Sequence, residues 1–292
     1  MKKRDLIAFI LIFAVLVVFL LIMYSFFRTP GEVDPLSFAG GDRVGVLELE
    51  GVIYQSRPFT DDLQKFLDNS SVKALVVRID SPGGGVAASQ EIYSALKRAA
   101  EIVPLVASMG SVAASGGYYA AIAADSIIAN PGTTTGSIGV LAQLPQFYRL
   151  MEKIGVSQEV IKSGKFKDTG NPYRQMTSAE KEYLQEWVDD TYEQFIEAVS
   201  EERGMELKEV RKLADGRVFT GRQALKLGLI DRIGDFRDAI LLAGEMGGIK
   251  GEPVILEKKK RKITLFDLLF GDLEENLQRL TEDHLQLMYI MP

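Results

Sequence analysis

Hydrophobic residues follow two different patterns along this chain. Residues 6–27 form one run of 22 residues without a charge. At about 1.5 Å rise per residue, a helix of this length crosses a hydrocarbon core of roughly 30 Å. From residue 43 onward, short apolar runs alternate with amphipathic segments and turn formers instead. The pattern therefore predicts one N-terminal transmembrane helix followed by a globular α/β domain.

The flanks of the first run predict its orientation. Lys2, Lys3 and Arg4 precede it, and such cationic flanks stay on the cytoplasmic side of a membrane. A cleaved signal peptide is the alternative, but its apolar part would span about 7 to 15 residues, and no small-x-small site follows before Arg28. We therefore expect a single-pass anchor in the cytoplasmic membrane, with the N-terminus inside and the globular domain outside.

Composition divides the chain into four segments. Residues 1–28 are the cytoplasmic tip and anchor, residues 29–42 a linker rich in proline and glycine, residues 43–247 the globular domain, and residues 248–292 a C-terminal extension. The net charge is −6, and no basic stripe suggests nucleic acid. The chain has no cysteine. This is compatible with an exported domain, because a domain of this size buries an adequate core without disulfides.

Alternating strand and helix patterns fill the globular domain. Continuous apolar runs between turn formers are typical of buried parallel strands, and crossover helices between them imply right-handed connections. Periodicity alone does not choose among α/β folds. The expected strands are residues 44–49, 74–79, 104–108, 126–129, 139–142 and 158–161. The expected helices are residues 63–69, 87–100 and 115–124, with a further helix from the capping box Thr177-Ser-Ala-Glu180.

Ser115 lies in a run of small residues, Gly-Ser-Val-Ala-Ala-Ser-Gly-Gly-Tyr-Tyr over residues 110–119. Glycine and alanine neighbours leave a hydroxyl open to a substrate, and the next peptide N–H is free to face an oxyanion. The alternative is a serine that caps a helix under a tight strand crossing. The pattern makes Ser115 a candidate nucleophile.

The sequence argues against a histidine base for such a serine, because His284 is the one histidine and lies close to the C-terminus. Lysine is the usual substitute, with a pKa brought from about 10.4 to near 7 or 8 by its surroundings. Lys165 and Lys167, on either side of Phe166 in a turn-rich stretch, are the candidates. A solvated basic loop is the alternative for this pair.

Four motifs in this order resemble signal peptide peptidase A in its short, single-repeat form. They are Asp-Ser-Pro-Gly-Gly-Gly (residues 80–85), the serine run (108–119), Thr-Gly-Ser-Ile-Gly (135–139) and Gly-Lys-Phe-Lys-Asp (164–168). The resemblance extends from about residue 43 to about residue 243. It implies a membrane-bound serine protease with a ClpP/crotonase-like spiral of repeated β-β-α units.

The resemblance also implies roles for individual residues. Ser115 matches the nucleophile and Lys167 the general base, which leaves Lys165 without a role. The oxyanion donors would be the N–H of Gly116 and one from Gly83 or Gly84, and Ser137 would orient the lysine. A plain glycine-rich turn remains the alternative for residues 80–85, and a β-turn serine remains the alternative for Ser137. No cofactor or metal is implied.

Membership of this family would further imply a ring-like homo-oligomer with each Ser115/Lys167 dyad shared between neighbouring subunits. The substrates would be remnant signal peptides or other hydrophobic peptide segments. The alternatives are a membrane protease that cuts one specific partner protein, a catalytically silent membrane-tethered scaffold, and an acyl-CoA enzyme, for which no nucleotide site is found. The apolar stretches 263–270 and 285–290 could lie on the membrane, on a neighbour, or in the protein's own groove.

Overall fold

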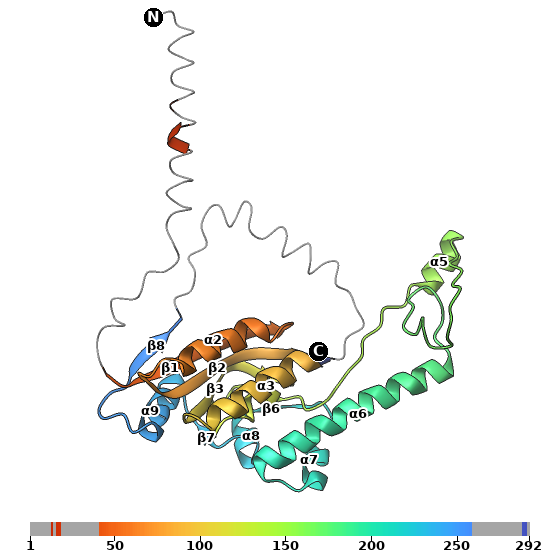
Figure 1. Cartoon of the computed structure of the whole chain (residues 1–292). Helices are drawn as coiled ribbons and strands as arrows, with labels where there is room; N and C mark the ends of the chain where they lie inside the picture. Colours follow the sequence, from red (N-terminus) through yellow and green to blue (C-terminus); the bar gives the residue numbers. More distant parts are fainter. Residues whose placement is uncertain (1–12, 14–15, 19–40, 259–287, 291–292) are drawn as a thin grey trace, which may run out of the picture. The chain divides into compact units, whose positions relative to one another are not determined.

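The computed structural model describes residues 13, 16–18, 41–258 and 288–290 (Figure 1). The chain divides into two units, residues 1–41 and 42–292, and the candidate site lies in the second. The expected anchor over residues 6–27 falls almost wholly outside the described residues. Among the residues that are described, no helix combines the length and apolar character needed to cross a bilayer.

One mixed sheet organises the second unit, and it confirms the expected α/β class. Its strand order is β6-β5-β3-β2-β1-β8, while β4 pairs with β3 and β7, and β9 pairs with β2. The pairings are parallel except for β5 with β6 and β2 with β9. The strands are β1 (Arg43–Ile53), β2 (Val72–Gly85), β3 (Leu105–Ala114), β4 (Ser126–Ala129), β5 (Thr134–Gly136), β6 (Val218–Thr220), β7 (Arg232–Ile233), β8 (Val254–Glu257) and β9 (Met288–Ile290).

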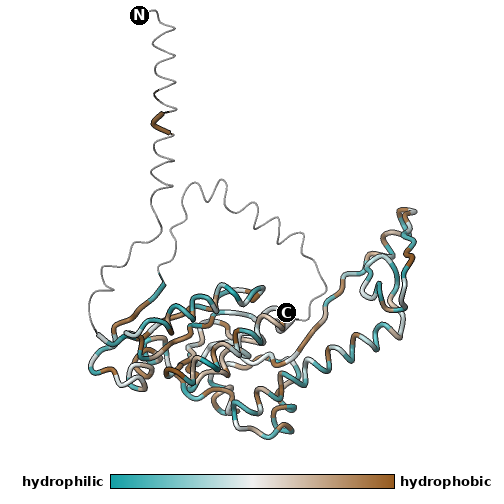
Figure 2. The backbone as a smooth tube through the Cα atoms, viewed as in Figure 1, coloured by the Kyte–Doolittle hydropathy of each residue, from teal (hydrophilic) through white to brown (hydrophobic). Residues whose placement is uncertain are grey.

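Helices cover both faces of this sheet. Because side chains alternate along a strand, Val44 and Val46 of β1 pack with α9 on one face, whereas Leu47 and Leu49 join the larger core on the other. Figure 2 shows hydrophobic stretches along the central strands. The helices are α2 (Arg57–Leu67), α3 (Val86–Ala100), α4 (Gly116–Ala121), α5 (Tyr148–Ile154), α6 (Ser178–Arg203), α7 (Leu207–Leu213), α8 (Gly221–Lys226) and α9 (Phe236–Met246).

Two strands run further than their apolar residues predicted. β2 continues through the glycine-rich motif to Gly85, and β3 continues to Ala114. A bulge in β3 makes this possible: Ile79 pairs with Met109 but Ser81 with Ala113, and the Asp80 carboxylate accepts hydrogen bonds from the N–H groups of Ser111 (3.3 Å) and Val112 (3.1 Å). The glycine-rich motif is therefore part of the sheet and not a turn.

Residues 140–177, which we call the arm, replace two expected strands. Residues 139–142 and 158–161 are not strands in the structure, and Ile161 is 96% exposed. α5 has no buried residue, so the apolar positions of the arm do not face the core. In Figure 1 the arm stands away from the sheet. Apolar runs alone could not separate a strand from an apolar surface.

α6 connects the arm to the core. Its predicted capping box is confirmed, because Thr177 accepts from the N–H of Glu180 and Glu180 accepts from the N–H of Thr177. The helix has 26 residues, and its second half buries Phe195, Ile196 and Val199. The C-terminal half is therefore fixed in the body of the molecule, while the N-terminal end carries the arm.

Candidate active site

Ser115 lies where β3 ends and α4 begins, and its backbone is strained. Its φ of 52° and ψ of −117° fall in a region that residues with a side chain rarely adopt. The conformation is held from both sides: the N–H of Ser115 donates to the Gly136 carbonyl (2.7 Å), and its own carbonyl accepts from the N–H of Tyr119 (2.8 Å). Strain of this kind costs about 1 to 3 kcal/mol and gathers at functional sites.

The hydroxyl of Ser115 is buried without a partner. The residue is 0% exposed, and Oγ has no hydrogen bond within the described part of the chain. An unsatisfied buried hydroxyl costs about 1 to 3 kcal/mol. Ser115 therefore combines two unfavourable features, and it does not cap α4 through its side chain. The helix-cap alternative is thereby removed.

Ser137 lies beside Ser115 through strand pairing. Ala114 of β3 pairs with Gly136 of β5, so the following residues of the two strands are neighbours. Ser137 also has a positive φ, 50°, and its N–H donates to the Arg217 carbonyl (2.9 Å). Phe219 of the facing strand β6 packs over Gly136, where a Cβ would approach its ring to 2.6 Å. The stretch 215–222 thus supports Ser137, a role that its sequence did not suggest.

The glycine-rich end of β2 forms the second wall of the site. Gly117 packs on Ser81, where a Cβ would lie 2.7 Å from the Ser81 carbonyl oxygen. The Ser81 hydroxyl, fully buried, donates to the Gly51 carbonyl (2.6 Å) and accepts from the N–H of Gly83 (3.1 Å). Ser81 therefore fixes the peptide of Gly83. Sequence reasoning missed it, although it lies within the motif that it singled out.

Gly84 is required by close backbone packing. A Cβ at this position would lie 2.1 Å from the carbonyl oxygen of Ile53 in β1. The structure thus brings five predicted residues to one end of the sheet, where the parallel strands β2, β3 and β5 reach their carboxyl ends. They are Gly83, Gly84, Ser115, Gly116 and Ser137. Carboxyl ends of parallel strands are the usual place for ligand sites in α/β proteins.

A short strand near the C-terminus of the chain lies at this end of the sheet. β9 pairs antiparallel with β2, with Gly83 opposite Ile290, Gly84 opposite Tyr289 and Gly85 opposite Met288. At Gly83 and Gly84, β1 pairs with one side of β2. β9 therefore pairs with the opposite side, the side on which β3 pairs with the earlier part of β2. β9 also contacts α4, which follows Ser115. An extended segment of peptide therefore lies beside the candidate nucleophile.

Lys167 lies in the arm and not beside Ser115. It is exposed on the arm that stands away from the sheet, and because Ser115 Oγ has no hydrogen-bond partner among the described residues, Lys167 Nζ does not hydrogen-bond to it in this chain. The neighbouring Lys165 places its Nζ 4.9 Å from the centre of the Phe166 ring, and that ring packs against Tyr183 of α6 at 5.2 Å. His284 lies outside the described residues.

Asp168, next to Lys167, is tightly paired. Its carboxylate accepts from Arg174 Nε (2.8 Å) and from Lys162, and these two cations hold the pKa of Asp168 well below its usual range. Arg174 also binds the buried Glu180, and this contact, followed by hydrogen bonds from Thr177, lowers the pKa of Glu180 to about 2. Both carboxylates are ionised at neutral pH.

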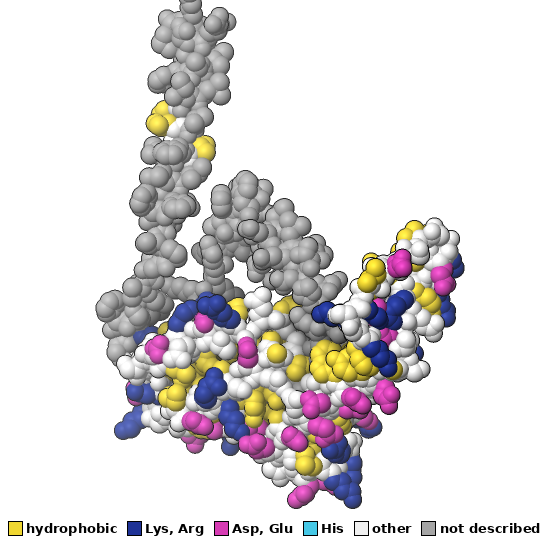
Figure 3. Space-filling view, turned by 45° about the vertical axis from the view of Figure 1, so that its right-hand side comes forward, with side chains coloured by type: hydrophobic (Ala, Val, Ile, Leu, Met, Phe, Trp, Pro, Cys, Tyr) yellow, Lys and Arg dark blue, Asp and Glu magenta, His cyan; other side chains and the backbone are white. Residues whose placement is uncertain are grey.

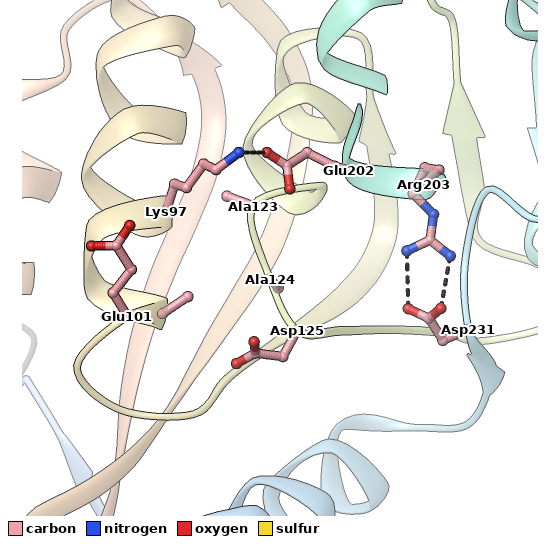
Figure 4. A pocket seen from close by; sticks show the side chains of 9 residues that line it. Lys97, Glu101, Ala123, Ala124, Asp125, Glu202, Arg203 and Asp231 are labelled. Carbon is pink, nitrogen blue, oxygen red and sulfur yellow. Dashed lines mark hydrogen bonds and ion pairs between the residues drawn. The ribbon is translucent and has the colours of Figure 1, made fainter. Parts of the chain in front are cut away.

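A separate pocket of about 470 Å³ is lined by none of the predicted site residues (Figure 4). Lys97 reaches across it to Glu202, and Arg203 forms a two-pronged pair with Asp231, whose nearer contact is 2.7 Å. The contact with Glu202 raises the pKa of Lys97. These pairs join α3, α6 and the residue that precedes β7, so the charged side chains of the pocket connect separate elements of the fold.

Comparison with known proteins adds a family to this geometry. The model of peptidase family S49 matches residues 97–250, which include Ser115, Ser137 and Lys167. The chain belongs to peptidase family S49. It is therefore a serine-type protease, and the resemblance to signal peptide peptidase A is confirmed at this level.

Three relatives show how far the similarity of this S49 peptidase extends. A Synechocystis protein named as a candidate protease is 42% identical over 224 residues, which are 76% of this chain and 81% of the relative. The chloroplastic serine protease SPPA of Arabidopsis thaliana is 34% identical over 230 residues, 78% of this chain and 34% of the relative. Protease 4 of Haemophilus influenzae is 33% identical over 215 residues, which are 70% of this chain and 35% of the relative.

Proposed function

We propose that this S49 peptidase is a membrane-anchored endopeptidase that uses a Ser115/Lys167 dyad to degrade remnant signal peptides or other hydrophobic segments near the bilayer. The observation that carries the proposal is the buried, unpartnered hydroxyl of Ser115 on a strained backbone. A relative from Enterococcus faecium bears the name of a signal peptide peptidase, which supports the substrate class. The predicted anchor over residues 6–27 would keep the enzyme where such peptides are released.

The proposed reaction begins at Ser115. Its Oγ attacks the scissile carbonyl carbon while its proton passes to the neutral amine of Lys167, and the carbonyl oxygen becomes an oxyanion. Gly116 and one of Gly83 or Gly84 would donate N–H groups to that oxygen. The ammonium of Lys167 then protonates the leaving amine, and the C–N bond breaks. Water, deprotonated by Lys167, hydrolyses the acyl-serine and regenerates the hydroxyl.

The two members of the dyad would come from neighbouring subunits. The arm holds Lys167 apart from Ser115 of its own chain, and its surface exposes apolar side chains: Phe147, Leu150, Ile154 and Val160 are each at least 39% exposed. Figure 3 shows hydrophobic side chains intermixed with basic and acidic ones on the arm. A neighbouring subunit would cover this surface and exclude water from Lys167. A ring of such subunits and a ClpP/crotonase-like spiral are part of the proposal.

Peptide substrates would bind as β9 does, as an extended strand on Gly83–Gly85. Backbone pairing recognises a peptide without selecting its side chains, which suits the degradation of varied sequences. The N–H of Gly83 now donates to Ser81, so its use as an oxyanion donor requires release of that bond.

The test of the function is to incubate the detergent-solubilised full chain with a mixture of signal-peptide fragments and to identify the products by mass spectrometry. We expect internal cleavages within the apolar cores of the fragments, absent with Ser115→Ala. Folded, assembled protein that leaves these fragments intact but cuts one defined protein would support the partner-specific protease. Protein that cuts neither would support the silent scaffold.

The position of β9 gives a further prediction. Deleting residues 285–292 should lower the apparent KM for peptides about 10-fold, because a tethered segment competes at a millimolar effective concentration for the same sheet edge. Steady-state kinetics on a fluorogenic peptide measure this. Deleting only residues 291 and 292 is the matched control and should leave KM unchanged. Equal KM values for both deletions would mean that β9 does not compete with substrate.

A further inference from the structure

Arg174 joins the segment that carries Lys167 to the first turn of α6. Its Nε donates to the Asp168 carboxylate (2.8 Å) and Nη2 to the Asp168 carbonyl (3.0 Å). On its other side, Nη1 donates to Glu180 Oε2 (2.9 Å) and Nη2 to Glu180 Oε1. One planar guanidinium thus bridges two carboxylates, which the point charge of a lysine could not do.

The Glu180 side of this bridge is rigid. The Glu180 side chain is 3% exposed, and its carboxylate also accepts from the N–H and the hydroxyl of Thr177, both at 2.8 Å. These bonds belong to the capping box of the long helix whose other half is buried in the core. Glu180 therefore fixes Arg174 relative to the body of its own subunit.

On its other side the bridge holds Asp168, the residue that follows Lys167. The turn is closed by hydrogen bonds from the N–H of Lys167 to the Gly164 carbonyl (3.2 Å) and from the N–H of Asn171 to the Asp168 carbonyl (3.1 Å). The Asp168 side chain is 11% exposed, and Lys162 takes its second oxygen. Arg174 thus holds both the backbone and the side chain of Asp168.

The same bridge keeps a carboxylate away from Lys167. Asp168 is adjacent in sequence, but Lys162 and Arg174 occupy both of its oxygens. Within the described part of the chain, Lys167 forms no ion pair. A carboxylate beside an amine favours the charged ammonium, which cannot accept a proton. Neutralisation of Asp168 by other cations leaves Lys167 available as a base.

We propose that Arg174 is a positioning residue for Lys167: it anchors the turn that carries the lysine to the N-terminus of α6 and keeps Asp168 from pairing with the lysine. The inference rests on the proposed function, in which Lys167 is the general base. Arg174 itself does not touch the substrate.

The first measurement is kcat and KM for Arg174→Ala on a fluorogenic peptide. We expect kcat to fall about 10²-fold, because an error of about 1 Å in the place of a catalytic group costs that much. KM should change little, since the peptide binds at Gly83–Gly85. Arg174→Lys, which restores the charge but not the fork, should recover part of the loss.

The pH profile of kcat separates positioning from general structural damage. In Arg174→Ala the acid limb should move to higher pH, because Lys162 keeps one Asp168 oxygen but the oxygen that Arg174 held is freed and favours the protonated form of Lys167. A second change, Asp168→Asn, should move the limb back although it removes a further contact. A merely structural role would give reduced kcat with the wild-type profile in both variants, and that result would overturn the inference.

Arg211→Ala is the matched control. Arg211 pairs with Glu193 of α6 through two hydrogen bonds, of 2.6 Å and 2.5 Å, and both side chains are exposed. Its loss should leave kcat and the pH profile unchanged. If Arg174→Ala does not fold or assemble, Arg174→Gln, which keeps a donor and most of the volume, is measured in its place.

Lys167→Ala distinguishes this inference from the proposed function. An inactive Lys167→Ala together with a wild-type kcat in Arg174→Ala or Arg174→Gln would overturn the inference alone. An active Lys167→Ala would overturn the dyad, and the role of Arg174 with it.

Discussion

Ser115→Ala should reduce peptide hydrolysis to background, a loss of about 10⁶-fold in kcat as for other serine nucleophiles. Lys167→Ala should be similarly inactive, because in the proposed dyad Lys167 takes the proton from Ser115. Lys165→Ala is the matched control: it lies two residues away, its ammonium contacts the Phe166 ring, and its loss should leave most of the activity. His284→Ala should also stay active. The measurement is hydrolysis of a fluorogenic peptide by the purified full chain.

The stability of these variants provides an independent check on Ser115. Removing a buried hydroxyl without a hydrogen bond takes away an unsatisfied polar group, so Ser115→Ala should unfold at the same temperature as the wild type or above it. Loss of activity without loss of stability is typical of a catalytic residue. An Ala variant that hydrolyses peptide normally, at either Ser115 or Lys167, would contradict the dyad.

Mixed oligomers should recover activity from two inactive chains. If Ser115 and Lys167 come from neighbouring subunits, equal amounts of Ser115→Ala and Lys167→Ala chains, dissociated and reassembled together, should show about a quarter of wild-type activity, since about one interface in four carries both intact residues. The structural reason is that the arm keeps Lys167 away from Ser115 of its own chain. Hydrolysis is measured after co-assembly is verified by differently tagged subunits.

A second mixture makes the test quantitative. Wild-type chains reassembled with an equal amount of the Ser115→Ala/Lys167→Ala double variant should also show about a quarter of full activity if the dyad is shared, but about half if it forms within one chain. A complementation mixture that stays inactive, together with half activity in the second mixture, would place both residues in one chain. The arm would then have to fold back onto its own subunit.

Several features of the fold followed from local sequence motifs. The family resemblance placed Gly83, Ser115 and Ser137 in one site, and the structure has all three at the carboxyl ends of β2, β3 and β5. The capping box at Thr177 and the strand at Ser126–Ala129 were also found where the sequence placed them. These features depend on neighbouring residues, and short-range patterns report them directly.

The arm and Ser81 could not be predicted in the same way. Residues 139–142 and 158–161 have the composition of strands, but whether an apolar segment pairs or stays exposed depends on the strands available to it elsewhere in the chain. Ser81 gained its role only because β2 continues through the glycine motif and brings its hydroxyl between Gly51 and Gly83. Contacts of this kind are set by tertiary structure.

The length of α6 imposes a rule on how this chain can change. The helix spans about 39 Å, with one end held in the core and the other carrying the turn of Lys167. A single residue inserted in its exposed half would rotate that turn by about 100° around the helix axis and advance it by about 1.5 Å. Insertions of seven residues, close to two full turns, would nearly restore the direction but lengthen the reach. Viable length variants of this protein should therefore keep α6 fixed and collect their insertions in the arm.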